Sequence, residues 1–169
     1  TYIFNINTGA SVEDLKFNNC SIKTFRGVVR VQGSGTGYFN NIVINNSIVS
    51  DIRDYGIINI GVATWKFNTI AFTNSTFYKC QKFILTSSTT PAKSILISDC
   101  TLNEETALGN KIFVFPATVT GNVTDGITIT NTIIGRGWDM AGTATTYGID
   151  PIDGLTATNF YVSNSFATS

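Results

Sequence analysis

Leu15-Lys16-Phe17-Asn18-Asn19-Cys20-Ser21-Ile22 is the stretch on which the fold of this chain depends. Its pattern is apolar-x-apolar-x-Asn/Asp-small-x-apolar, and it returns every 25 to 32 residues. Further copies begin at Ile42, Ile70, Ile95, Ile127 and Leu155. Periods of this length are typical of solenoids, in which each repeat is one supersecondary unit. The sequence therefore predicts a stack of similar units.

Each copy predicts two short strands that meet at a bend. Leu15 and Phe17 share one face by the period of two, and Asn19 then interrupts the alternation. Asn tolerates the left-handed backbone region better than other non-glycine residues, so a bend there is chemically sensible. Stacking the copies aligns Asn19, Asn46, Asn74, Asp99, Asn131 and Asn159, whose side chains we expect to hydrogen-bond along the stack.

A third strand is expected in every repeat. Apolar segments rich in Ile, Val and Phe recur at 3–6, 28–31, 57–60, 83–85 and 112–115, while helical periodicity is nearly missing. One such coil cannot bury its own apolar face, so its stability must come from stacked neighbours. The prediction is an all-β, single-stranded parallel β-helix of about six coils with three strands each, a single domain over 1–169.

Composition excludes several function classes. The chain has 11 basic and 11 acidic residues, so no net field favours nucleic acid. His is absent, which removes the usual general base near neutral pH and the commonest metal ligand. No stretch approaches the roughly 18 apolar residues of a membrane span. The chain starts at Thr1 without a signal sequence, and we expect it to be a piece of a longer protein.

The cysteines indicate packing rather than a disulfide framework. Three cysteines are present, Cys20, Cys80 and Cys100, and no CxxC pair occurs. Cys20 and Cys100 occupy the same repeat position three copies apart, which places them roughly 14 Å apart in a stack of parallel strands. A disulfide spans at most about 7 Å between Cα atoms. We therefore expect free cysteines that behave as small buried residues, and no zinc or redox site.

The repeated Leu-x-Phe-x-Asn-Cys-x-Ile phrase and its column of Asn residues resemble the right-handed β-helices of the pectate-lyase-like superfamily. More narrowly, the chain is similar to β-helix domains of Bacteroidetes surface proteins encoded beside polysaccharide-uptake genes. The resemblance implies a right-handed helix and an association with carbohydrate. It also implies that a polysaccharide would lie along the outer face of the third strand and its flanking loops.

The variable connections concentrate charge along one edge of the predicted prism. The segments 23–27, 50–56, 78–82, 103–111 and 135–147 hold more than half of the charged residues. On the third strand, alternation points Arg30 outward, in a row with Asn5 and Asn59. With Arg26 and Arg53 nearby, this row suits an anionic sugar chain held by guanidinium–carboxylate pairs. The alternative is an ordinary solvated face.

Asp51 and Asp54 are the nearest approach to a pair of catalytic carboxylates. Glycoside hydrolysis needs two carboxyl groups about 5–9.5 Å apart. If the chain is an enzyme, we expect Asp51 and Asp54 to act with Arg53 or Arg30. The acidic pairs of active relatives are not recognisable, so catalysis stays open. No metal site is predicted, although Asp51 and Asp54 leave calcium open as a cofactor.

The longest connection, 135–147, holds Arg136, Trp138 and Asp139. An exposed Trp there can stack on a sugar ring while its charged neighbours bind hydroxyls, and the alternative is that Trp138 covers the end of the prism. Further aromatic residues, for which packing is the favoured interpretation, are Tyr38, Tyr55, Trp65 and Tyr78.

The leading hypothesis is an extracellular or cell-surface module that binds a polysaccharide without catalysis. Its predicted ligand-binding residues are Arg26, Arg30, Asn59, Arg136, Trp138 and Asp139. One alternative is a polysaccharide lyase or glycoside hydrolase acting on an acidic glycan. Another is a structural stalk or adhesin segment. We expect a monomer, anchored at the outer membrane or periplasmic if part of a longer protein.

Overall fold

The computed structural model describes residues 1–7, 9–33, 35–52, 56–61, 65–86, 92–102, 110–114, 123–134, 138–139, 160–163 and 166–167. Within these residues the secondary structure consists of β-strands and contains no helix. The chain is therefore all-β in its described part, as the sequence predicts.

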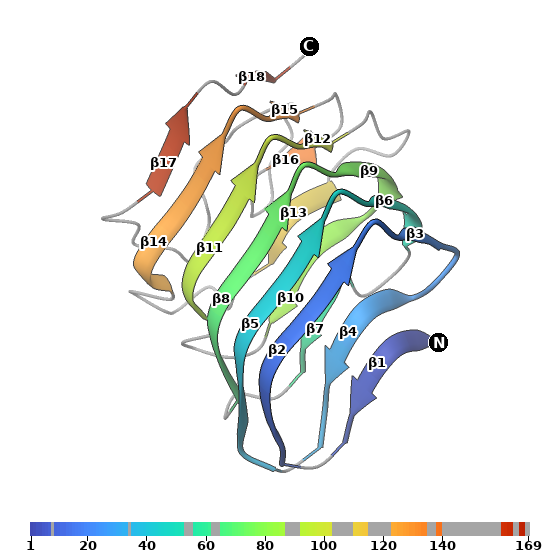
Figure 1. Cartoon of the computed structure of the whole chain (residues 1–169), viewed down its shortest axis with the longest axis vertical. Coiled ribbons are helices and arrows are strands. Elements are labelled where there is room, and N and C mark those ends of the chain that lie inside the picture. Colours follow the sequence, from blue (N-terminus) through green and yellow to red (C-terminus); the bar gives the residue numbers. More distant parts are fainter. Residues whose placement is uncertain are drawn as a thin grey trace.

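The strands form three parallel sheets (Figure 1). Sheet A contains β1 (Tyr2–Ile6), β4 (Gly27–Val31), β7 (Ile58–Ile60), β10 (Lys82–Thr86), β13 (Asn110–Val114) and β16 (Trp138–Asp139). Sheet B contains β2 (Ser11–Asn18), β5 (Gly37–Asn45), β8 (Trp65–Thr73), β11 (Ala92–Ser98), β14 (Val123–Thr130) and β17 (Phe160–Ser163). Sheet C contains β3 (Ser21–Lys23), β6 (Ile48–Ile52), β9 (Thr76–Cys80), β12 (Thr101–Leu102), β15 (Ile133–Ile134) and β18 (Phe166–Ala167).

Each strand pairs with its equivalent from the neighbouring coil, so the chain winds through the three sheets in turn and forms a parallel β-solenoid. The third strands at 28–31, 57–60 and 83–85 are confirmed within one or two residues as β4, β7 and β10. The expectation of about six coils is not met, because about three turns are described as a solenoid. Beyond β12 the chain is described only in short separate stretches.

The bend at the repeated Asn has the left-handed backbone that its residue type predicts. The φ angles are 56° at Asn19, 47° at Asn46, 48° at Asn74, 55° at Asp99 and 48° at Asn131. Asn159 lies outside the described residues. The expected ladder of amides is present only in part. Asn46 donates to Asn19 at 2.6 Å, whereas Asn74 donates to Asn45, one residue before the bend, at 3.1 Å.

A second ladder, which the sequence analysis did not predict, follows these bends inside the solenoid. The residue after each bend carries a hydroxyl or a thiol: Cys20, Ser47, Ser75, Cys100 and Thr132. The Ser47 hydroxyl accepts the backbone N–H of Cys20 at 3.0 Å and donates to the carbonyl of Asn45 at 2.8 Å. Ser75 repeats this with the N–H of Ser47 at 3.0 Å and the carbonyl of Thr73 at 2.7 Å. Buried backbone groups at the corner are thereby satisfied.

The thiols take the same place in this ladder. Cys100 donates to the carbonyl of Ser98 at 3.2 Å, and its own N–H donates to the Thr132 hydroxyl at 3.4 Å. Burial raises the pKa of the Cys100 thiol to about 11, which a hydrogen bond with the Ser75 backbone partly opposes. All three cysteines are free. Cys100 is buried as expected, whereas Cys20 in the first coil, for which burial was also expected, is only partly buried. Cys80 on sheet C is buried as well.

A second left-handed bend closes sheet C in the first three coils. Thr24, Asp51 and Lys79 occupy equivalent positions, with φ angles of 64°, 54° and 53°. The sequence does not reveal this bend, because Thr, Asp and Lys share no property that favours a positive φ, apart from the tolerance of Asp. Asp51 therefore lies within β6 with a left-handed backbone that its tertiary contacts impose.

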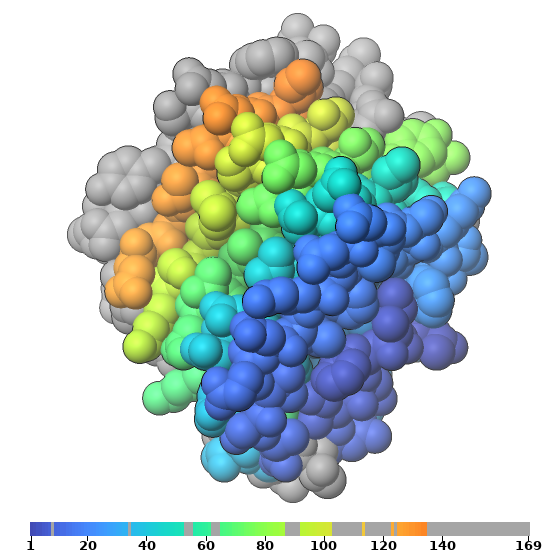
Figure 2. Space-filling model, in the orientation of Figure 1, coloured from blue at the N-terminus to red at the C-terminus, as the bar shows by residue number. Residues whose placement is uncertain are grey.

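The core is a column of apolar side chains between the three sheets. Phe39 and Phe67 stack with their ring centroids 4.9 Å apart and their planes 4° from parallel. Phe72, Phe77 and Phe83, one from each sheet, meet with centroids 4.5–5.5 Å apart. Trp65 is fully buried, which confirms packing as its role. The first coil, blue in Figure 2, lies at the surface. Its residues Phe4, Leu15 and Phe17 are only partly buried, whereas Tyr2 and Ile22 are buried.

We expect Ser47→Ala to lower the free energy of unfolding by about 1–3 kcal/mol, because it leaves the partly buried N–H of Cys20 without its acceptor. Ser47→Cys should cost less, since a thiol fills the same place at Cys100. Urea denaturation measures both changes. Ser21→Ala, on an exposed position of β3, is the matched control and should change stability by no more than about 0.5 kcal/mol. Equal losses for Ser47→Ala and Ser21→Ala would contradict the ladder.

Asn46→Ala should destabilise the fold by about 1–2 kcal/mol, because a Cβ-bearing residue without a polar side chain is strained at a φ of 47°. Asn46→Gly relieves this strain and loses only the amide bond to Asn19, so its loss should be smaller. Thermal or urea unfolding checks the order. An Ala variant as stable as the Gly variant would show that backbone strain does not decide this position.

Candidate functional site

The predicted row of Asn5, Arg30 and Asn59 is present on sheet A, since the three residues are in register on β1, β4 and β7. The ring of Tyr2, however, lies beside this row. The Arg30 guanidinium carbon is 5.4 Å from the centre of the Tyr2 ring, and Asn59 donates to the Tyr2 hydroxyl at 3.1 Å. Asn59 is only 5% exposed, so it is not the solvated side chain that alternation suggested. The other two members of the row differ from it, since Asn5 is exposed and Arg30 is partly exposed.

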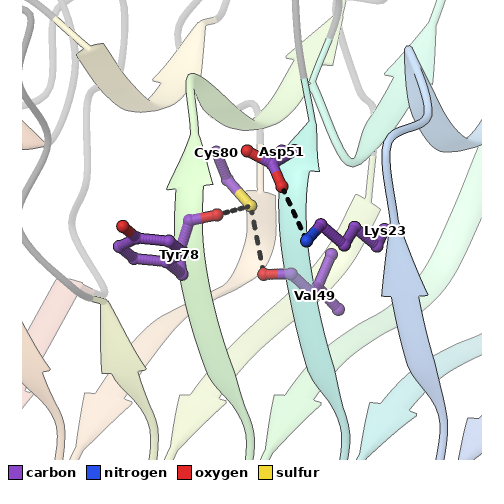
Figure 3. A network of polar contacts seen from close by, with 5 residues as sticks. All are labelled: Lys23, Val49, Asp51, Tyr78 and Cys80. Atoms are coloured by element: carbon purple, nitrogen blue, oxygen red, sulfur yellow. Dashed lines mark hydrogen bonds and ion pairs between the residues drawn. The ribbon is translucent and has the colours of Figure 1, made fainter.

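Of the predicted acidic pair, Asp51 and Asp54, only Asp51 lies within the described residues. Its carboxylate lies 3.9 Å from the Lys23 ammonium group, and the two side chains point toward each other across neighbouring strands (Figure 3). The Cys80 thiol nearby points to the carbonyl groups of Val49 and Tyr78 instead. The other members of the predicted catalytic set, Arg53 and Asp54, lie outside the described residues. The structure therefore brings no second carboxylate to Asp51 within its described part.

The remaining predicted ligand-binding residues do not converge in the described structure. Arg26 is exposed in the turn between β3 and β4, where its N–H donates to the Thr1 carbonyl at 3.0 Å. Trp138 and Asp139 were expected in a loop. Instead they form the short strand β16, which pairs with Asn110 and Lys111 of β13. Arg136 lies outside the described residues.

The described residues contain no candidate calcium site. No three side chains among the His, Cys, Asp and Glu residues of that part of the chain gather closely enough to hold a metal ion. Calcium sites need several converging oxygen ligands. Asp51, with a lysine as its charged neighbour, does not supply them.

A different set of side chains meets on the outer face of sheet B. Ser11, Tyr38 and Lys66 are in register on β2, β5 and β8, near the beginning of each strand. Together with Thr36 and Gly37 they line an open hollow of about 470 Å³. A side chain at Gly37 would collide with the Ala10 carbonyl and the Trp65 ring, so glycine is needed for the close approach of strands here. We refer to this hollow as the Tyr38 hollow.

Packing is the favoured interpretation for Tyr38 and Tyr78, and both side chains are exposed, at 40% and 38%. The Tyr38 hydroxyl donates to the Glu13 carboxylate at 2.6 Å. This hydrogen bond, together with the negative charge of Glu13, raises the pKa of Tyr38 above its ordinary value of 10.0. The bond also restrains the partly exposed ring at the surface.

Two pairs of polar side chains continue from the Tyr38 hollow along the same face. Asn68 donates to the Asn40 side chain at 2.6 Å, across β8 and β5. Asn41 donates to Asp14 at 2.8 Å, across β5 and β2. The Asn41 hydrogen bond is the main cause of a lowered pKa at Asp14, and the ammonium group of Lys16, 3.5 Å away, adds to it. The face therefore presents amides and paired charges rather than one dominant sign.

The sequence holds a signal for the Tyr38 hollow. Ser11, Tyr38 and Lys66 each stand four residues before the start of their copy of the repeat. Strands of a solenoid align equivalent positions, so this shared offset predicts that the three side chains are neighbours. The apolar positions of the repeat do not reveal this alignment, because these residues precede the repeat and lie in connections of variable length.

Comparisons of the chain with protein-family models, with curated proteins and with solved structures found no match. The parallel β-solenoid is shown by the structure, and membership of the pectate-lyase-like superfamily stays a prediction. Within the described residues we find no helix of the length and apolarity needed to cross a membrane.

Glu13→Gln should bring the pKa of Tyr38 back toward 10.0, because the charged acceptor of its hydroxyl is lost. Since the folded pKa is raised, the stabilisation from this contact is present below pH about 10 and is lost as the pH rises through the folded value. Titration of the Tyr ring carbons by NMR measures the shift. Asp14→Asn on the same strand is the control and should leave the Tyr38 titration in place. An unchanged curve in Glu13→Gln would refute the contact.

Proposed function

We propose that this chain binds a polysaccharide on the outer face of sheet B without catalysing a reaction on it. The observation that carries the proposal is the exposed Tyr38 ring, held by its hydrogen bond to Glu13 in a hollow shared with Ser11 and Lys66. Ligand sites are typically concave, with an apolar or aromatic surface and a few convergent polar groups. A tyrosine offers both an apolar ring face and a polar tip.

The solenoid geometry supports a polymeric ligand. Equivalent side chains on neighbouring strands recur at about 4.8 Å along the stack. The pairs Asn40–Asn68 and Asp14–Asn41 repeat amide donors and acceptors in this direction. A chain of repeating sugar units lying along the solenoid axis would meet similar groups at successive steps. Stacked-repeat proteins commonly use such extended surfaces for binding.

Catalysis has less support than binding. Asp51 lies within β6 with a φ of 54°, and its carboxylate is directed toward Lys23. Hydrolysis by a carboxylate pair needs a second carboxyl group at a set distance, and the described residues place none beside Asp51. We therefore place the ligand at the Tyr38 hollow, on another sheet from Asp51.

Two finer features of the fold belong to the same proposal. We propose that the helix is right-handed, because nearly all parallel crossover connections have that hand. We also propose that the full chain completes about six coils, since β13 to β18 extend all three sheets in the order that the repeat predicts. The resemblance to carbohydrate-associated β-helices and the neutral surface support an extracellular or cell-surface location.

The test is calorimetric binding to a panel of neutral and acidic polysaccharides. Wild type should bind at least one of them, and Tyr38→Ala should weaken that binding about tenfold, equivalent to about 1.4 kcal/mol, because the stacking surface is removed. Tyr78→Ala is the matched control, since Tyr78 is similarly exposed, at 38%, but lies on sheet C.

Absence of binding across the panel, or an equal loss in the Tyr38 and Tyr78 variants, would refute the site. Release of reducing ends or of unsaturated sugars by wild type would overturn the non-catalytic part of the proposal. Repeating that assay with Asp51→Asn would then decide whether this carboxylate takes part.

A further inference from the structure

A regular pattern of outward side chains covers the second half of three strands of sheet B. β5, β8 and β11 lie side by side (Figure 1), and their residues are in register. On each strand two polar residues enclose one apolar residue, and these outward positions alternate with buried residues of the core. We call the nine outward residues the Ala71 face: Asn41, Val43 and Asn45 of β5, Thr69, Ala71 and Thr73 of β8, and Ser94, Leu96 and Ser98 of β11.

The apolar row of the Ala71 face follows the solenoid axis and is one side chain wide. Val43 and Leu96 are partly exposed, and Ala71 between them is 7% exposed. Neighbouring strands lie about 4.8 Å apart, so the row offers an apolar contact at that interval. A ligand that covers the row would remove this apolar area from water.

A row of amides and hydroxyls lies on each side of the apolar row, roughly 6.6 Å from it, because outward positions are two residues apart along a strand. In one polar row, the Ser94 hydroxyl donates to the Thr69 hydroxyl at 3.3 Å. In the other, the Thr73 hydroxyl donates to the Asn45 side-chain oxygen at 2.8 Å. An amide has two N–H donors and a hydroxyl oxygen accepts twice. These bonds therefore use only part of the hydrogen-bonding capacity of the two rows.

The Ala71 face carries no charge, since none of its nine residues is acidic or basic. Lys66 and Lys93 lie outside it, nearer the beginning of β8 and β11. On the neighbouring strand β2, Asp14 and Lys16 pair with each other at 3.5 Å. A polyanion would therefore gain no ion pair from the face itself. A protein partner would need a wider contact, because specific interfaces bury at least about 1,000 Å².

We propose that the Ala71 face is a second polysaccharide site, and that its ligand is a neutral chain of β-1,4-linked pyranose units extended along the solenoid axis. When the hydroxyls of such a chain are equatorial, its ring faces carry C–H groups and its hydroxyls lie at the two edges. The ring faces then contact the apolar row, and each edge meets one polar row. The spacing of the rows suits half the width of a sugar ring plus one hydrogen bond of about 2.8 Å.

This second site is separate from the Tyr38 hollow. Ala71 lies five residues beyond Lys66 on β8, which is roughly 17 Å at the rise of a β-strand. A chain that follows the solenoid axis over the Ala71 face therefore does not pass over the Tyr38 ring. The two sites also differ in character, because the hollow contains a charged residue and an aromatic ring, whereas the Ala71 face contains neither.

Methyl NMR of wild type with cellohexaose as the neutral probe tests the position of the site. The methyl signals of Val43, Ala71 and Leu96 should shift in a saturable manner. The Ile48 methyl groups are the control within the same spectrum, because Ile48 is 57% exposed but lies on sheet C. Absence of shifts, or equal shifts at Ile48, would overturn the site. Hexagalacturonate is the acidic probe, and a stronger response to it than to cellohexaose would overturn the ligand class.

Ala71→Gln should weaken cellohexaose binding at least tenfold, because a longer polar side chain covers the apolar row. Thr76→Gln, at a partly exposed position of β9 on sheet C, is the matched control and should bind as wild type does. Urea unfolding of both variants separates lost binding from lost folding, and the methyl shifts of wild type test the site without either variant. Unchanged binding by a folded Ala71→Gln variant would contradict the proposal.

Tyr38→Ala distinguishes the two sites. It should leave the cellohexaose-induced methyl shifts of the Ala71 face in place, and loss of those shifts would assign the probe to the Tyr38 hollow and overturn the second site. The calorimetric comparison of Tyr38→Ala with Tyr78→Ala tests the Tyr38 hollow by itself, so either conclusion can fail without the other.

Discussion

The left-handed bend at the Asn or Asp of each repeat, together with the hydroxyl or thiol that follows it, is the constraint on which the rest of the structure depends. The bend turns the chain from sheet B into sheet C. It leaves backbone groups inside the solenoid, where they need partners other than water. Ser47 and Ser75 supply those partners between coils, and Cys100 and Thr132 continue the arrangement. These hydrogen bonds fix the strand register of each coil relative to the next.

This registration also creates the surface at which we propose that a ligand binds. Once strands are locked in register, side chains at one repeat position form a row whose chemistry the repeat itself does not restrict. Ser11, Tyr38 and Lys66 share such a position and form the Tyr38 hollow. This hollow belongs to sheet B, which has the longest strands in each of the first three coils.

The predictable parts are those that depend on local sequence. The bends at Asn19, Asn46 and Asn74 follow from the backbone tolerance of Asn, and β4, β7 and β10 follow from apolar alternation. The bend at Thr24, Asp51 and Lys79 escaped prediction because these residues share no preference that would mark it. Asn59 was expected to be solvated, since alternation indicates a face but not whether another side chain, here Tyr2, reaches across it.

The sequence by itself determined the period, the bend and the three strands of each coil, because those follow from residue preferences and from the need of each coil to bury one face. The tertiary structure decided which outward side chains are available. Tyr38 is exposed while Trp65, on the neighbouring strand, is buried, and Asn59 is closed off while Asn41 is reachable. Exposure depends on contacts between residues far apart in the chain, and a local pattern carries no information about such contacts.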